Sequence, residues 1–359
     1  MRLRAGAITS TGTSSWTTPD PLSQVITDIR PGWAVPGGRV ALSGQELPLP
    51  PEGPPHVAVG GTTALVVSAS SQRVRFVVPT ELTGGTTPVR VDGLHGETAY
   101  LEVASTIASD VHHVDSPLFD GRGRLYVTNS GSRGERPVTP LLRFDRDGTR
   151  TSLAVEVGNP TSLALGPDGL TYISSRFDGQ VYRLLPDDTP ELFATGLGVA
   201  TGLAFDPAGN LFVGDRSGTV FRVTPSRAIE EFASLPASTA AYHLAFGPDE
   251  KLYVSVPTLG SHDALYRIGP DREVETVTKW FGRPQGLAFD ETGELYVVDA
   301  LAGAAGLFRL DPQEPETPPE QVLAAPALVG VAFDPSGGVA LASNEAVWRL
   351  DVPITPLRF

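Results

Sequence analysis

A unit of about 40 residues recurs six times between residue 105 and the C-terminal end, and it constrains the fold more than any other sequence feature. In each copy, an apolar run such as GLAF leads into a turn such as DPAG, and an alternating run such as NLFVGD follows. One position at the start of the turn marks the copies: Asp120, Gly166, Asp206, Gly247, Asp290 and Asp334. These marks are 46, 40, 41, 43 and 44 residues apart, and such even spacing indicates one structural unit repeated.

Each unit has the pattern of four short β-strands. A third apolar run, such as LLRFD or QVYRLL, follows the alternating run, and a weaker fourth, such as ELFATG, ends the unit. β-branched and aromatic residues suit strands, Pro, Asp and Gly supply turns, and no helical period is present. Four strands in 40 to 46 residues are typical of a propeller blade, so we predict a six-bladed β-propeller over residues 105–359.

The sixth unit has only three clear strands, so ring closure requires one strand from elsewhere. Residues 106–108, just before the first unit, and residues 353–359, at the C-terminal end, are the two candidates. We favour residues 106–108, because that strand ties the two ends of the ring together and leaves no exposed sheet edge.

The N-terminal third predicts a second, smaller β domain. Residues 26–104 contain short alternating strands broken by Gly and Pro, which is typical of a small β-sandwich. Residues 1–25 are rich in Ser and Thr, and we expect a disordered or linker segment there. The fold class predicted for the whole chain is therefore all-β.

Several short motifs of the N-terminal third suggest what kind of sandwich it is. The order of residues 26–31, Gly37-Gly38, Ser43-Gly44, Val59-Gly60-Gly61 and Val77-Val78-Pro79 resembles that of the IPT/TIG group of immunoglobulin-like domains. The resemblance implies an immunoglobulin-like β-sandwich that acts as a spacer or as an adhesion and assembly module.

Composition excludes several classes of function. The chain has no cysteine, which excludes disulfides, a thiolate nucleophile, Cys-ligated zinc and iron–sulfur clusters. Its net charge is −14, which disfavours nucleic-acid partners and anionic membrane surfaces. No apolar run reaches the roughly 18 residues needed for membrane insertion, and no segment has the pattern of a signal peptide. We expect a cytoplasmic location by default, or an extracellular one if a leader has been removed.

The direction of the strands predicts which residues lie together as a candidate site. Strands alternate in direction within a blade, so the starts of inner strands and the ends of second strands lie on one face of the disc. Ligands usually bind there, where the inner strands converge on the central channel. The inner-strand starts supply His112, His113, Asp115, Ser116, Thr161, Thr201, Tyr242, His243, Arg283 and Gln285, and the second-strand ends supply Asn129, Arg176, Asp215 and Asp299.

The repeated GLAFD-x-x-G-x-LYV-x-D units resemble NHL-repeat proteins and the senescence-marker-protein/gluconolactonase family of six-bladed propellers. That resemblance implies a lactone hydrolase with a divalent metal, calcium or zinc, in the channel. The family's Glu-Ser-Pro start resembles Asp115-Ser116-Pro117, so the resemblance assigns Asp115 as the metal ligand. The family's Asn-Gly and Asp-Gly starts have no counterpart at Thr201-Gly202, Tyr242-His243 or Gln285-Gly286.

Histidine supports a second reading of the channel chemistry. His113 and His243 are the candidate catalytic residues, because imidazole moves protons near neutral pH. Six-bladed relatives that cleave streptogramin antibiotics also use a channel histidine with a metal, and they are a weaker comparison. Two functions remain open: hydrolysis of a small polar molecule such as a lactone, and non-enzymatic binding, in which the propeller face docks a peptide or glycan and the TIG-like domain is a spacer.

Overall fold

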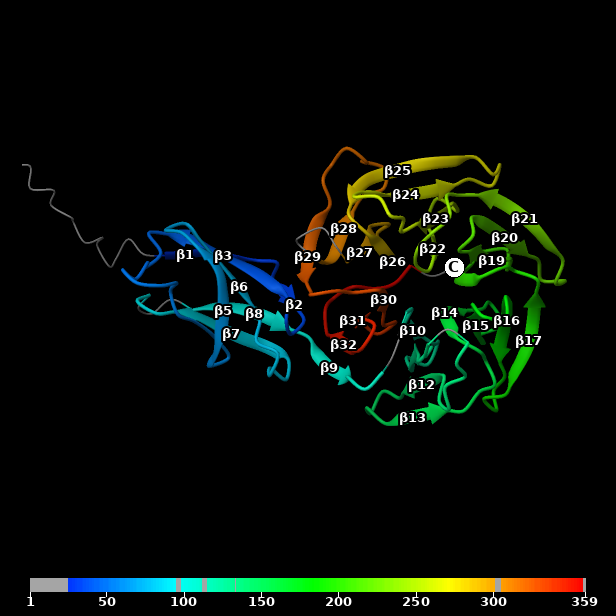
Figure 1. Cartoon of the computed structure of the whole chain (residues 1–359), viewed down its shortest axis with the longest axis horizontal. Helices are drawn as coiled ribbons and strands as arrows, with labels where there is room; N and C mark the ends of the chain where they lie inside the picture. The colour runs from blue at the N-terminus through cyan, green and yellow to red at the C-terminus, as the bar shows by residue number, and fades with distance from the viewer. Residues whose placement is uncertain (1–24, 95–97, 112–114, 133, 301–304, 358–359) are drawn as a thin grey trace, which may run out of the picture.

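The structure is a computed structural model that describes residues 25–94, 98–111, 115–132, 134–300 and 305–357 (Figure 1). Every regular element in these ranges is a β-strand, which confirms the all-β prediction. None of the described segments forms an apolar helix of the length that crossing a bilayer takes.

The N-terminal module, residues 25–103, contains eight strands in the described ranges. They are β1 (Val25–Arg30), β2 (Trp33–Ala34), β3 (Arg39–Gln45), β4 (Val57–Val59), β5 (Thr62–Ala69), β6 (Arg73–Val77), β7 (Gly85–Val91) and β8 (Ala99–Val103). They are ordered β1-β3-β6-β5-β4-β7-β8-β2. Alternation along β3 and β6 buries Val40, Leu42, Val74 and Phe76 in one core and leaves the intervening residues facing outward. The immunoglobulin-like assignment stays a prediction.

Five separate four-stranded sheets follow, arranged around a common centre (Figure 1). The first two are β10 (Leu118–Phe119), β11 (Leu125–Thr128), β12 (Leu141–Phe144) and β13 (Arg150–Leu153), then β14 (Pro160–Leu165), β15 (Thr171–Ser175), β16 (Gln180–Leu184) and β17 (Pro190–Thr195). The next two are β18 (Ala200–Phe205), β19 (Leu211–Asp215), β20 (Thr219–Val223) and β21 (Ile229–Ser234), then β22 (His243–Phe246), β23 (Leu252–Ser255), β24 (Asp263–Ile268) and β25 (Val274–Phe281). The fifth sheet is β30 (Gly330–Phe333), β31 (Val339–Ala342), β32 (Val347–Leu350) and β9 (Ser105–Ala108).

The sequence predicts six blades, and the structure has five separate four-stranded sheets. The strands expected to form the remaining blade are β26 (Pro284–Phe289), β27 (Leu295–Asp299), β28 (Gly306–Leu310) and β29 (Glu320–Ala324). They pair in the same order, but β2 pairs in parallel with both β29 and β8. The result is one twelve-stranded sheet that runs from the N-terminal module into the ring, because β2 covers the outer edge that β29 would otherwise expose.

The ring closes as predicted. β9 pairs antiparallel with β32, with Ala108 opposite Val347 and Thr106 opposite Trp348. The C-terminal segment has another position: the Leu357 N–H donates to the Phe289 carbonyl, and Pro356 bridges to Asp290. The strand from before the first blade is therefore the one that completes the last sheet.

Inner strands converge on a central channel. A cavity of about 530 Å³ at one end of it is lined by residues of β10, β14, β18, β22, β26 and β30, with Pro356 and Leu357 of the C-terminal segment. Its walls are mostly apolar, with side chains such as Leu203, Phe246 and Phe333. The apolar cavity lies at the end of the inner strands where the repeated turns begin, so the opposite end carries the strand starts.

Candidate functional site

Hydroxyl groups join neighbouring sheets at the strand-start end of the channel. The hydroxyl of Ser174, in β15, donates to the Thr201 carbonyl of the next inner strand at 2.6 Å. Ser255, in β23, does the same to the Gln285 carbonyl at 2.7 Å, and Thr128, in β11, to the Thr161 carbonyl at 3.4 Å. Because both partners are buried polar groups, these bonds fix the inner-strand starts against one another.

Asp115 and His243 meet in the channel. His243 opens β22, and Asp115 precedes β10 by three residues, so the two come from different sheets of the ring. The imidazole Nε2 of His243 lies 3.2 Å from Asp115 Oδ1. Its other ring nitrogen, Nδ1, lies 3.4 Å from the Ser116 hydroxyl. A carboxylate, an imidazole and a hydroxyl thus form one contiguous group, and it joins segments 127 residues apart in sequence.

This group is almost removed from solvent. The side chains of His243 and Asp115 are 4% and 14% exposed. Burial raises the pKa of the Asp115 carboxyl above its ordinary value, and electrostatic interactions with His243 and Arg176 offset part of that rise. His243 Nε2 is within ion-pair distance of Asp115 but lacks the alignment of a hydrogen bond. The pair therefore holds a proton-exchanging group in a low-dielectric setting, where charge interactions are strong.

Thr201 and Tyr242, two other residues predicted from strand direction, form hydrogen bonds within the protein. The Thr201 hydroxyl donates to the Gly214 carbonyl and accepts from the Tyr242 N–H at 3.1 Å. Tyr242 is fully buried, and its hydroxyl donates to the Pro236 carbonyl. Burial also raises the pKa of the Tyr242 phenol. Tyr242 is therefore a core residue of its sheet rather than a lining residue of the channel mouth.

Asp215 and Asp299 brace the segments that enter the inner strands. Asp215 Oδ1 accepts from the Val199 N–H at 2.8 Å, just before β18. Asp299 accepts from the backbone N–H groups of Gly282 and Arg283, both at 2.9 Å, just before β26. These carboxylates satisfy backbone donors at equivalent places in two sheets, so each is occupied in holding the entry loop.

The remaining candidates lie around the same face. Thr161 and Gln285 are buried at the starts of β14 and β26, and Arg283 is half-buried in the loop before β26. Asn129 Nδ2 donates to the Thr139 carbonyl at 3.1 Å, and Arg176 to the Gly131 carbonyl at 3.4 Å. His112 and His113 lie outside the described residues.

Asn159 is a residue that the sequence reasoning missed. Its amide nitrogen donates to the carbonyls of Ser130 and Ser132, and its Oδ1 accepts from the Gly134 N–H at 2.8 Å. It is fully buried and has a φ of 44°, in the left-handed region that Asn tolerates. The sequence feature that could have identified Asn159 is its place directly before Pro160, where the chain enters an inner strand.

The described residues do not assemble a donor set for the divalent metal that the family resemblance implies. They contain no group of three or more His, Cys, Asp or Glu side chains placed to hold an ion. Asp115 and His243 are two such donors, whereas zinc takes four ligands and calcium six or more.

Comparison with known proteins identifies the fold. No protein-family model matches the chain, and no curated protein sequence does. A gluconolactonase from Xanthomonas campestris is similar in structure, with a TM-score of 0.58 and 17% identity over 70% of this chain and 89% of that one. An auxiliary nutrient binding protein from Bacteroides thetaiotaomicron has a TM-score of 0.53 and 14% identity, over 92% and 98%.

A catalytically inactive His-to-Ala variant of virginiamycin B lyase from Staphylococcus aureus, solved with quinupristin, is also similar. Its TM-score is 0.51 and its identity 15%, over 83% of this chain and 94% of that one. At these identities the likeness concerns the fold alone. Together with the sheets around the channel, it defines the chain as a β-propeller protein.

Proposed function

We propose that the protein hydrolyses a small polar lactone or ester at the Asp115–His243 pair in the propeller channel. The observation that carries this proposal is the 3.2 Å contact between His243 Nε2 and Asp115 Oδ1, two side chains that are almost fully buried. A base beside a carboxylate, with a hydroxyl near its other nitrogen, is an arrangement that suits general-base catalysis.

In the proposed reaction, His243 is the general base. The Ser116 hydroxyl is 3.4 Å from Nδ1, longer than an ordinary hydrogen bond, so a water molecule can compete for that nitrogen. Nδ1 takes a proton from the water while the water oxygen bonds to the substrate carbonyl carbon. Collapse of the tetrahedral intermediate breaks the carbon–oxygen bond of the ester, and the imidazolium returns the proton to the leaving alkoxide. Asp115 orients the ring and stabilises its positive charge.

A lactone panel with His243→Gln tests this proposal. We expect turnover to fall by about a hundredfold or more, because a positioned acid–base group contributes roughly 10²–10⁴ in rate. Ser116→Ala should cost less than about tenfold, since water is the nucleophile. His56→Gln is the matched control, because His56 is an exposed histidine of the N-terminal module.

Two results would contradict the mechanism. Equal turnover by wild type and His243→Gln would show that His243 is not the general base. Complete loss of turnover in a chelator would support the metal-assisted reaction, with Asp115 as a metal ligand. Product analysis on a cyclic depsipeptide lactone separates hydrolysis from the elimination that a lyase performs.

The second candidate function is binding without turnover. It is supported by the likeness to an auxiliary nutrient binding protein, which extends over 92% of this chain and so includes the N-terminal module. On this proposal, the channel mouth takes a peptide, glycan or small molecule, and the Asp115–His243 pair contributes polar contacts only. Saturable binding of a ligand that the wild-type protein does not convert to product would favour binding without turnover over hydrolysis.

We also propose the architecture that this function requires. The β26–β29 strands act as the sixth blade, because β26 lines the channel cavity beside the other five inner strands. The boundaries 1–25, 26–104 and 105–359 divide the chain into a leading segment, an IPT/TIG-like sandwich and the propeller.

A further inference from the structure

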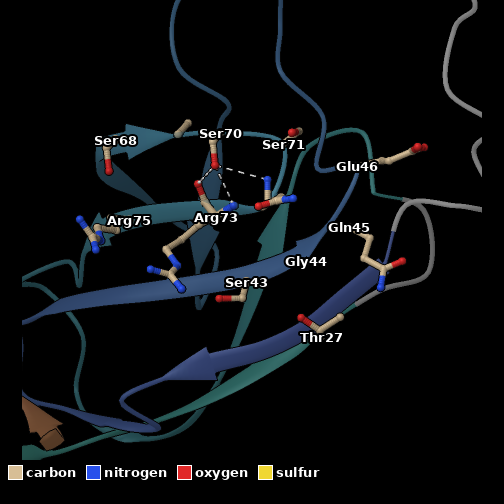
Figure 2. Close-up of a pocket in the computed structure, with 12 residues that line it drawn as sticks. Thr27, Ser43, Gly44, Gln45, Glu46, Ser68, Ser70, Ser71, Arg73 and Arg75 are labelled. Carbon is tan, nitrogen blue, oxygen red and sulfur yellow. Dashed lines mark hydrogen bonds between the residues drawn. The ribbon is translucent and has the colours of Figure 1, made fainter.

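The outward face of the sheet formed by β1, β3, β6 and β5 carries a polar groove of about 840 Å³, far from the channel residues in sequence (Figure 2). Its lining includes hydroxyl and amide side chains, among them Thr27, Ser43, Ser68, Gln45 and Gln72. Its volume is within the range of about 300–1,000 Å³ that is usual for ligand sites.

Strand alternation places arginines on this face. In β6, Val74 and Phe76 point into the module core, so Arg73 and Arg75 point outward. In the sheet register, Arg73 lies opposite Ser43 of β3, and Arg75 opposite Ser68 of β5. Figure 2 shows the two arginines on β6 near these serines, with Glu46 at the rim of the groove. The groove therefore contains two guanidinium groups among hydroxyl groups.

Within the part of the chain that the structure describes, these two guanidiniums have no ion-pair partner, whereas several propeller arginines do. In the third and fourth strands of the propeller sheets, Arg183 pairs with Glu191, Arg267 with Glu275 and Arg309 with Glu320. In the described residues of the N-terminal module, the ion pairs are Arg30–Asp28 and His56–Asp92. Neither pair involves Arg73 or Arg75, so on a chain of net charge −14 this face keeps positive charge available.

The groove is held in shape by backbone contacts. The Ser70 hydroxyl accepts from the N–H groups of Gln72 and Arg73 and donates to the Arg73 carbonyl. The Gly44 N–H donates to the Gln72 carbonyl at 3.0 Å, and the Leu47 N–H donates to the Ser71 carbonyl at 2.8 Å. The turn that leads into Arg73 is therefore tied to the end of β3, which reduces the ordering required when a ligand binds.

We propose that this groove binds an acidic polysaccharide, with Arg73 and Arg75 holding its carboxylate or sulfate groups. Arginine binds such planar anions with paired hydrogen bonds, and the serine, threonine and glutamine side chains suit the ligand's hydroxyl groups. Among the described residues, no aromatic side chain lines the groove, which disfavours single-stranded nucleic acid, since its bases need stacking platforms. The inference goes beyond the proposed function, because it gives the N-terminal module a ligand of its own.

Affinity measurements on the full chain test this proposal. The probes are polygalacturonate, a sulfated dextran and neutral dextran, titrated against wild type and the Arg73→Ala/Arg75→Ala double variant. We expect the wild type to bind one or both anionic polymers and not neutral dextran, with affinity falling at least about tenfold in the double variant. The carboxylated and sulfated probes identify which anion the groove prefers.

Arg90→Ala is the control, because Arg90 is exposed on β7 of the same module and outside the groove. Its loss removes one positive charge, where the double variant removes two. An equal loss of affinity in Arg90→Ala, binding of neutral dextran as strong as that of the anionic polymers, or binding of single-stranded DNA that weakens in the same way would each overturn the proposal. Asp115→Asn should leave polysaccharide binding unchanged, so this test fails or succeeds separately from the hydrolase proposal.

Discussion

At the scale of single residues, the environment of Asp115 changes the chemistry of its carboxyl. Its carboxyl is mostly buried. Desolvation raises the pKa of this carboxyl, and electrostatic interactions with His243 and Arg176 lower it by less. The net effect is a raised pKa, so ionised Asp115 destabilises the folded state relative to the unfolded one. Functional carboxylates often have this property, because activity requires a group that stability alone would not retain.

Asp115→Asn should therefore stabilise the protein at neutral pH. A carboxyl whose pKa is raised on folding contributes stability below its unfolded pKa, near 3.8, and loses that contribution as the pH rises through its folded pKa. The gain from Asn should be largest above that window and should shrink as the pH falls. Urea unfolding of both proteins between pH 4 and 8 measures the difference, and a variant less stable than wild type at pH 7 would contradict it.

At the scale of elements, close backbone contacts decide where the inner strands can lie. Gly330 opens β30, and a Cβ at this position would lie 2.0 Å from the Asp115 carbonyl oxygen and 2.6 Å from Pro117 Cδ. No real contact is that short, so the last sheet and the segment entering the first can meet only over a glycine. The position of Asp115 in the site thus depends on a residue in a different sheet.

Gly330→Ala should destabilise the protein by about 1–3 kcal/mol, the usual cost of overpacking, and reduce turnover by displacing Asp115. Gly121→Ala is the matched control, because a Cβ there meets nothing within 4 Å. Denaturant unfolding with a parallel activity assay measures both effects. Equal stability of the two variants would show that the contact between the sheets relaxes without cost.

At the scale of the whole molecule, β2 makes the N-terminal module and the ring one hydrogen-bonded body. Trp33 lies opposite Leu323 of β29 on one side and Glu102 of β8 on the other. The Val35 N–H also donates to the Ala324 carbonyl at 2.9 Å. The module is therefore attached to the propeller by a continuous sheet, which is stiffer than the linker that joins most neighbouring domains.

Calorimetry should show a single unfolding transition for the two parts. In Gly38→Ala, a Cβ would lie 2.4 Å from the Ala324 carbonyl, so we expect the junction to loosen and the transition to split. Gly32→Ala controls for the substitution, since a Cβ there meets nothing within 4 Å. Two transitions in the wild type would contradict the proposed coupling.

Much of the candidate site was predictable, and the limits are physical. Strand direction predicted that the residues around 115 and 243 share one face of the disc, because a repeat fixes the direction of each strand. The same rule also selected Tyr242 and Asp215, since direction does not say which side chains turn into the core or bind nearby backbone. The groove with Arg73 and Arg75 needed a cross-strand register, which no local pattern in the sequence specifies.

The sequence by itself determined the all-β fold, the repeat and the closing strand, because turn residues and strand alternation act over a few residues. Only the tertiary structure decided that β2 joins the module to β29, and that His243 reaches Ser116 across 127 residues and lies beside Asp115. Those contacts depend on how separate sheets pack, and packing is set by the three-dimensional fit of distant surfaces rather than by local propensity.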